Sequence, residues 1–100
     1  MSRALHLRDN RLQALPPAIG ALAQLRHLDL RANRLRAVAP EVAGLPRLRV
    51  LDLRANRLAT LPDALADAPA LEKLDLRWND LRALPRAASA LARRGCFVLW

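Results

Sequence analysis

The sequence repeats itself at a fixed interval, and this repetition limits the folds open to the chain more than any other feature. The letters LDLRANRL occupy residues 28–35 and again residues 51–58, and the variant LDLRWNDL occupies residues 74–81. Asparagine falls at positions 10, 33, 56 and 79, so each copy follows the previous one by 23 residues. Such a period predicts stacked structural units that share one core, because a unit of this size buries its apolar face only against its neighbours.

Leucines hold the same places in each copy, three and five residues before the asparagine. Because L-x-L alternates with a period of two, each pair predicts a short strand with one apolar face. Proline then follows at positions 16–17, 40, 62 and 85, and proline suits the first turn of a helix. Each unit is therefore predicted to be a strand, a turn and a short helix. The leucine pairs are Leu5 and Leu7, Leu28 and Leu30, Leu51 and Leu53, and Leu74 and Leu76.

This arrangement resembles the leucine-rich repeat family. The pattern L-x-x-L-x-L-x-x-N-x-L is complete in LRHLDLRANRL, LRVLDLRANRL and LEKLDLRWNDL, whereas SRALHLRDNRL has Ser2 in place of the leading leucine. The tail of the 23-residue class is clear in LPPAIGAL, but VAPEVAGL places its proline one residue late. The resemblance implies an α/β solenoid, a right-handed superhelix with a parallel concave sheet and short helices or 3₁₀ turns on the convex side.

The resemblance covers one domain over residues 1–100, with repeats at about 2–24, 25–47, 48–70 and 71–93 and a closing strand at 95–100. Each repeated asparagine is expected to satisfy backbone groups left unpaired where the strand bends away. In the closing strand, Phe97 and Leu99 fall 23 residues after Leu74 and Leu76 and are predicted to face inward. Cys96, Val98 and Trp100 would then face outward.

The positions between the inward leucines form two charged columns on the concave face. One column is Asp29, Asp52 and Asp75, and the other is Arg8, Arg31, Arg54 and Arg77. Two interpretations stay open: a surface ion network that satisfies itself, or a charged platform for a complementary partner protein. The candidate partner-binding residues are Arg8, His27, Asp29, Arg31, Asp52, Arg54, Lys73, Asp75, Arg77, Trp78 and Trp100.

Two tryptophans interrupt the regular pattern at the C-terminal end. Trp78 stands beside the last repeated asparagine, where the middle copies have alanine, and Trp100 ends the sequence. They are interpreted either as a binding patch beside Arg77 and Lys73 or as a cap, with Trp100 covering the last coil. Trp and Arg are enriched among interface hot spots, whereas an edge strand also needs a cover.

The charge balance is basic, with 17 Lys and Arg against 9 Asp and Glu and a formal net charge of +8. This excess favours anionic partners, although a genome that favours arginine codons would produce it as well. No basic run interleaves with aromatic residues, so RNA or DNA binding through the arginine columns is an alternative to protein binding rather than the first expectation.

Enzymatic chemistry is not expected. There is no Gly-rich phosphate loop among three glycines, and Cys96, the single cysteine, has no histidine near it in the repeat. No cofactor or metal is expected either, because Arg8 and Arg31 would compete with a metal for Asp29 beside His6 and His27. The N-terminal residues lack the apolar segment of a secretory signal, and no apolar run reaches membrane-spanning length. The sequence thus predicts a cytoplasmic, non-enzymatic protein-binding module, whose uncapped first repeat should fray or self-associate.

Overall fold

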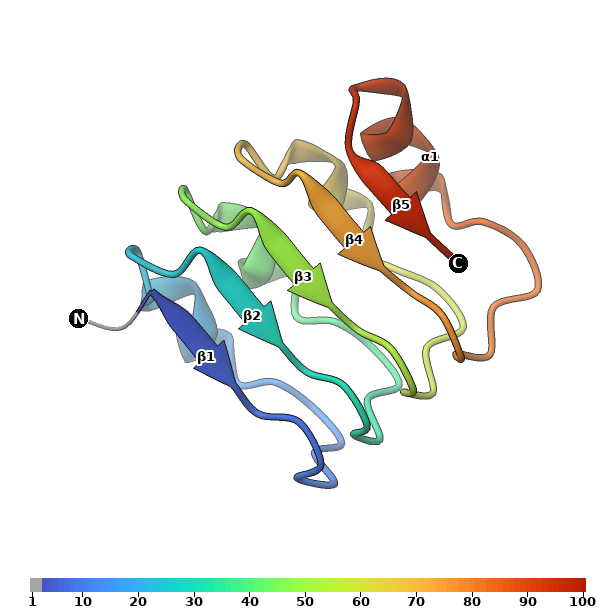
Figure 1. Cartoon of the computed structure of the whole chain (residues 1–100), viewed down its shortest axis with the longest axis horizontal. Helices are drawn as coiled ribbons and strands as arrows, with labels where there is room; N and C mark the ends of the chain where they lie inside the picture. Colours follow the sequence, from blue (N-terminus) through green and yellow to red (C-terminus); the bar gives the residue numbers. More distant parts are fainter. Residues whose placement is uncertain (1–2) are drawn as a thin grey trace.

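The computed structural model describes residues 3–100 as one parallel sheet backed by short helices (Figure 1). Ser2, which replaces the leading leucine of the first repeat, lies outside the described residues. The strands lie side by side in the order of the chain, β1-β2-β3-β4-β5. The elements are β1 (Ala4–His6), 3₁₀ helix η1 (Pro17–Ala21), β2 (His27–Asp29), η2 (Pro40–Gly44), β3 (Val50–Asp52), η3 (Asp63–Asp67), β4 (Lys73–Asp75), α1 (Arg86–Arg93) and β5 (Phe97–Leu99).

The first four strands pair in the register of the sequence repeat. Leu5 lies opposite Leu28, Leu28 opposite Leu51, and Leu51 opposite Leu74. This register stacks the inward leucines in columns, so that those of β2, β3 and β4 are fully buried. We refer to the segments that begin at β1, β2, β3 and β4 as coils 1 to 4. The prediction of a leucine-rich repeat solenoid is confirmed.

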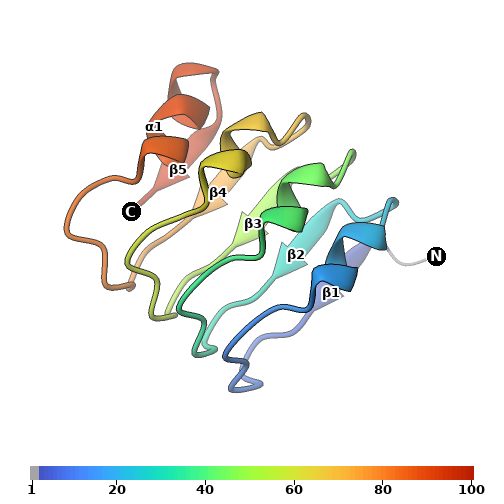
Figure 2. The same cartoon turned by 180° about the vertical axis from the view of Figure 1, so that it is seen from behind.

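The helices cover the second face of the core (Figure 2). Helices η1 and η2 begin at a proline, which fixes the backbone and needs no hydrogen bond there. Each 3₁₀ helix buries a single apolar side chain: Ile19, Val42 and Leu65. The short helices are therefore held mainly by packing between coils, because a helix this short is not stable alone.

The repeated asparagines connect neighbouring coils, as the sequence predicts. The side-chain amide of Asn56 donates to the carbonyl of Leu53 in its own coil and to that of Leu30 in the previous coil, at 3.1 and 2.9 Å. Its Oδ1 accepts a hydrogen bond from the backbone N–H of Leu35. Asn33 and Asn79 repeat this pattern. The side-chain amides of these asparagines are therefore occupied by hydrogen bonds to the backbone and are not available to bind a ligand.

The last repeat is one residue longer than the others, and the predicted register of β5 is wrong for that reason. Helix α1 is a true α-helix, and Gly95 follows it with φ +97°, a backbone conformation that residues with a side chain rarely adopt. The pairing places Val98 opposite Leu74 and Phe97 opposite Lys73, an offset of 24 residues. Cys96 is buried and Val98 packs against the core, whereas Phe97 is 59% exposed.

Trp100 accordingly does not continue the arginine column. It follows Leu99, which pairs with Asp75, so its place in the register is that of Leu76. Trp100 is 58% exposed and leaves Phe97 uncovered. In this last repeat α1 buries Ala87, Ala88 and Leu91, and β5 forms the edge of the sheet.

Candidate functional site

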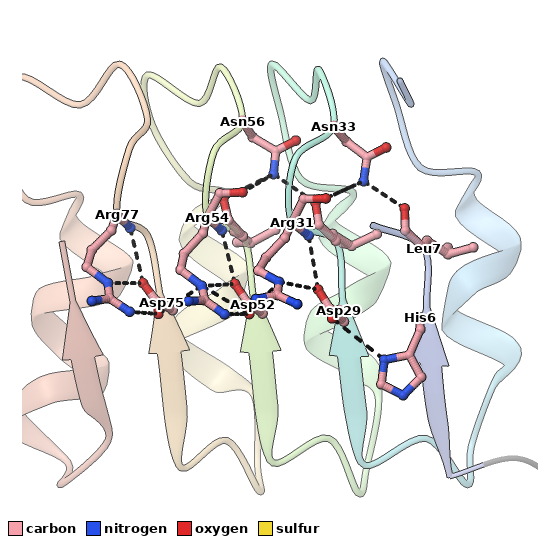
Figure 3. A network of polar contacts seen from close by, with 12 residues as sticks. His6, Leu7, Asp29, Arg31, Asn33, Asp52, Arg54, Asn56, Asp75 and Arg77 are labelled. Atoms are coloured by element: carbon pink, nitrogen blue, oxygen red, sulfur yellow. Dashed lines mark hydrogen bonds and ion pairs between the residues drawn. The ribbon is translucent and has the colours of Figure 1, made fainter. Parts of the chain in front are cut away.

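The concave face of the sheet carries an alternating ladder of acidic and basic side chains (Figure 3). Arg31, Arg54 and Arg77 each follow an aspartate by two residues, so both members of each pair project from the same face of the chain. Arg54 binds Asp52 through Nε and Nη2, at 2.9 and 2.6 Å, and its Nε also lies 3.3 Å from Asp75 of the next coil. Arg77 binds Asp75 in the same way. The ladder therefore joins neighbouring coils as the asparagines do.

The ladder is looser at its N-terminal end. Arg31 lies 3.5 Å from Asp29 and 3.7 Å from Asp52, without the paired hydrogen bonds of Arg54. His6 takes the place of an aspartate in coil 1, and its Nδ1 lies 3.6 Å from Asp29. The ring of His27 contacts that of His6 edge-on, with centroids 5.6 Å apart.

The three aspartates are buried, which the interpretation as a surface network did not anticipate. Asp29, Asp52 and Asp75 are 3–7% exposed. Each carboxylate also accepts a hydrogen bond from the backbone N–H of the arginine two residues later, at 3.1–3.2 Å. The sequence signal for this turn is the D-x-R spacing itself, because aspartate readily caps the backbone two residues on. The carboxylates are thus held in place and hold the arginines in turn.

Electrostatic interactions favour the charged forms of Asp29, Asp75, Arg54 and Arg77. Burial disfavours the charged form of Asp75, but hydrogen bonds from the Arg77 side chain and backbone outweigh it and lower the pKa of Asp75. Burial likewise opposes ionisation of Asp29, and the Arg31 backbone and guanidinium, with His6, bring its pKa below the ordinary value. Accepting groups on Asp52 and Asp75 raise the pKa of Arg54 and Arg77, respectively. All these charges persist at neutral pH.

A shallow depression of about 350 Å³ lies beside the ladder and gathers several predicted residues. Arg8, Arg31, Arg54 and Trp78 line it, together with Asp9, Ala32 and Ala55. It therefore extends across coils 1 to 4. Trp100 does not belong to its lining, and Lys73 is exposed at the start of β4. The structure thus brings together three of the four arginines of the column and one of the two tryptophans, whereas Arg77 lies outside the lining.

Trp78 is held in an unusual backbone conformation. Its φ is +62°, and Asp9, Ala32 and Ala55 have positive φ at the same position of the other coils. A bulky residue rarely adopts this left-handed conformation. The side chain is 70% exposed, and the Arg77 guanidinium lies 5.5 Å from the centre of its ring. The turn thus displays an indole at the rim of the depression instead of burying it in the core.

Sequence reasoning missed the special position of Arg8. Within residues 3–100, no carboxylate lies within ion-pair distance of Arg8, whereas Arg31, Arg54 and Arg77 each have one or two. The signal was present, because coil 1 has His6 where the next three coils have aspartate. Arg8 is therefore the end of the ladder that lacks an ion pair, although its charge helps to lower the pKa of Asp29.

Three further properties of residues 3–100 bear on metal binding, thiol reactivity and membrane insertion. No group of three or more His, Cys, Asp and Glu residues there is arranged to hold a metal ion. Burial raises the pKa of the Cys96 thiol, although Arg94 acts in the opposite direction, so the thiol is mostly protonated at neutral pH. Between residues 3 and 100, no helix has both the length and the apolar character needed to cross a membrane.

Comparison with known proteins agrees with this architecture. A family model described as leucine rich repeat matches residues 23–81. No curated protein matches the chain. Among solved structures, a leucine-rich repeat protein of Leptospira interrogans is similar, with a TM-score of 0.87 and 30% sequence identity. The match covers 98% of this chain but 25% of that protein, so the chain spans about a quarter of its length.

The family model extends over more than half of the chain, and the structural match covers nearly all of the remainder. Proteins with these repeats generally mediate protein–protein interactions and are generally non-enzymatic scaffolds. The chain belongs to the leucine-rich repeat family.

Proposed function

We propose that the chain is a non-enzymatic, cytoplasmic module that binds a partner protein through the concave face of its sheet. The observation that carries this proposal is the depression shared by all four coils, lined by Arg8, Arg31, Arg54 and Trp78. Since ion pairs already hold Arg31 and Arg54, they lose little conformational entropy when a partner binds. Arg and Trp are also the residues most enriched among interface hot spots.

The candidate residues contribute in two ways. Arg8, Arg31, Arg54, Arg77 and Trp78 are accessible enough to contact a partner directly, whereas the buried carboxylates position the guanidinium groups. His27 and Lys73 lie at the start of their strands, toward the opposite rim of the sheet. We place Trp100 outside the proposed surface, because it lies beyond β5 and away from the depression. The positioning residues are Asp29, Asp52 and Asp75.

Affinity capture from a lysate of the source organism tests this function. The bait is the wild-type chain, and the test variant carries Arg8→Glu and Trp78→Ala, two exposed residues whose side chains do not enter the core. Arg86→Glu with Arg93→Ala is the control, because both arginines are exposed on α1. The proposal expects the same proteins on wild type and control and their loss from the test variant. Equal capture by all three baits would contradict it.

Nucleic-acid binding through the arginine columns is the alternative. Proteins that bind single strands usually stack several bases on several aromatic side chains, and the depression offers Trp78 as its one aromatic lining residue. Binding to phosphates also weakens steeply as salt rises. If the chain captures RNA or DNA that nuclease treatment destroys and that high salt releases, this result would favour the alternative.

Self-association is a second candidate, favoured by an apolar hollow at the N-terminal end. The hollow measures about 320 Å³ and is lined by Leu5, Leu7, Leu12, Leu15 and Ile19, among other residues. Burying this surface against a second copy would stabilise coil 1 through the hydrophobic effect. Sedimentation over a range of concentrations tests this candidate: a shift from monomer to larger species, abolished by Leu5→Glu, would support it. A monomer at all concentrations would contradict it.

A further inference from the structure

The carboxylates of the concave ladder are closed to a ligand. The side chains of Asp29, Asp52 and Asp75 are almost fully buried. Each carboxylate accepts a hydrogen bond from a backbone N–H and forms an ion pair with at least one arginine. A partner therefore meets the basic members of the ladder, together with the exposed Asp9, which lines the depression next to Arg8. The side chains of Arg31, Arg54 and Arg77 remain 30, 23 and 40% exposed.

The bonds within the ladder leave donors for a partner. Arg54 and Arg77 use Nε and one terminal nitrogen on their own aspartates. A guanidinium has further N–H groups, and these match the paired oxygens of a carboxylate. A guanidinium that is already oriented by a buried carboxylate also keeps a fixed position when it binds a second one.

Arg8 is the point where the ladder lacks a carboxylate. In coils 2 to 4 an aspartate stands two residues before the arginine, whereas in coil 1 that position is His6. Arg8 is exposed and, among the described residues, has no acidic group within ion-pair distance. A carboxylate from a partner would give Arg8 the interaction that the other coils supply internally.

Trp78 marks the opposite end of the same depression. Its indole is exposed and its backbone is held in a conformation unfavourable for so large a side chain. Arg77 lies over the ring and limits its motion. An apolar or aromatic side chain of a partner would find a fixed, flat contact there.

The distance between these two ends sets the size of the ligand. Arg8 belongs to coil 1 and Trp78 to coil 4, so three strand spacings separate them, or about 14 Å at roughly 4.8 Å per strand. An extended peptide covers that distance in about four to five residues. Resting on the proposed function, we propose that the concave face binds a short acidic segment of its partner, with one carboxylate on Arg8 and an apolar side chain on Trp78.

A binding assay with defined probes tests this partner class. The first probe is a fluorescent eight-residue peptide in which four glutamates precede a leucine. The second has glutamine in place of glutamate, and the third is a uridine oligonucleotide of similar length. The proposal expects the acidic peptide to bind at least about tenfold more tightly than either of the others, as charge-assisted hydrogen bonds require.

Three variants locate the binding. Arg8→Ala and Trp78→Ala should each weaken the acidic peptide by about tenfold. Arg8→Ala should change the melting temperature only slightly, because Arg8 forms no ion pair among the described residues and acts on Asp29 only through a longer-range charge interaction. Arg86→Ala removes the same charge from the outer surface of α1 and should change affinity less than twofold. Equal weakening by Arg8→Ala and Arg86→Ala would overturn the proposal, since binding would then follow net charge alone.

The remaining outcomes are also decisive. Tighter binding of the oligonucleotide than of the acidic peptide would overturn the acidic segment and favour nucleic acid. No preference between the glutamate and glutamine peptides would overturn it as well. Either result could stand beside capture of a partner protein that depends on the concave face, so failure of this inference is distinguishable from failure of the proposed function.

Discussion

Coils 1 and 3 share the leucine and asparagine positions of the repeat and make equivalent backbone hydrogen bonds across the sheet. Coil 3 packs between coils 2 and 4, whereas coil 1, among the described residues, packs against coil 2. The N–H of Leu7 donates to the carbonyl of Asp29 at 2.8 Å, and that of Leu53 to Asp75 at 2.9 Å. Leu53 is nevertheless fully buried, whereas Leu7 is half-buried beside the apolar hollow. The cross-sheet hydrogen bonds are thus equivalent while the burial of the leucines differs, and we expect apolar stacking between coils to contribute more to stability than these bonds do.

The same difference separates structural residues from residues free to bind. Arg54 of coil 3 is committed to Asp52 and Asp75, whereas Arg8 of coil 1 is not committed to any carboxylate among residues 3–100. Under the proposed function, the end of the ladder with the fewest internal ion pairs therefore offers the most to a partner. The following predictions test this contrast between coils, beginning with the largest expected effect.

Leu53→Ala should lower the free energy of unfolding by about 3–5 kcal/mol, because it opens a cavity in a fully buried leucine column. Leu7→Ala removes the equivalent side chain from coil 1 and should cost roughly 1–2 kcal/mol, since much of that side chain is already exposed. Urea denaturation of the two variants measures the difference. Equal losses would show that coil 1 is as well packed as coil 3.

Asn56→Ala should cost about 2–3 kcal/mol, because it leaves buried backbone groups of coils 2 and 3 without partners. Asn10 is exposed, and its side-chain amide donates only within its own coil, to the carbonyls of Leu7 and Arg8. We therefore expect Asn10→Ala to cost less than about 1 kcal/mol, where water replaces the lost bonds. Thermal unfolding of both variants provides the measurement, and a larger effect at Asn10 would contradict the account.

Acid should destabilise the fold through coils 2 and 4. The pKa values of Asp29 and Asp75 are lowered in the folded chain. Near these pKa values, the folded chain therefore binds fewer protons than the unfolded chain does. Their contribution is complete above the unfolded pKa, about 3.9, and disappears as the pH falls through the folded values. The melting temperature should be nearly constant from about pH 7 to 5 and fall below about pH 4. Asp75→Asn should make this fall shallower, and a melting temperature that rises on acidification would refute the sign.

Trp78→Asn should have the smallest effect on stability and the opposite sign. Asparagine tolerates positive φ better than tryptophan, a gain of about 1 kcal/mol. Loss of the exposed contact with Arg77 offsets about half of it. Calorimetry should show a net stabilisation of about 0.5 kcal/mol, together with weaker binding of the acidic peptide. A clear destabilisation would mean that Trp78 supports the core, against its exposed position.

The regular part of this fold could be predicted from sequence because each position is fixed by the same physical requirement in every coil. The 23-residue spacing determines which leucines face inward and which asparagines bridge coils. The register of β5 could not be obtained from that spacing, since α1 and Gly95 lengthen the last repeat by one residue. The sequence does contain a helix-forming run followed by Gly95. These residues are easily overlooked when the 23-residue repeat is used to align the last copy.

The sequence predicts which residues of the candidate site line up across the sheet, but not which of them are buried or form ion pairs. Alternation places Asp52 and Arg54 on one face, yet burial of the carboxylate depends on backbone curvature and on the next coil. The role proposed for Arg8 likewise depends on the residue two positions earlier, which is His6 and not an aspartate. The proposed site thus rests more on the exceptions to the repeat, at His6 and Trp78, than on the repeat itself.

Native-state hydrogen exchange tests the central claim most directly, because it compares equivalent amides in one sample. The amides of Leu7 and Asp9 in coil 1 correspond to those of Leu53 and Ala55 in coil 3, and all four donate across the sheet. In a dilute, monomeric sample, we expect the coil 1 amides to exchange at least about tenfold faster, a difference of roughly 1.4 kcal/mol in opening free energy. Equal protection at all four amides would contradict the claim that stacking between coils, and not the hydrogen bond of each strand, stabilises this fold.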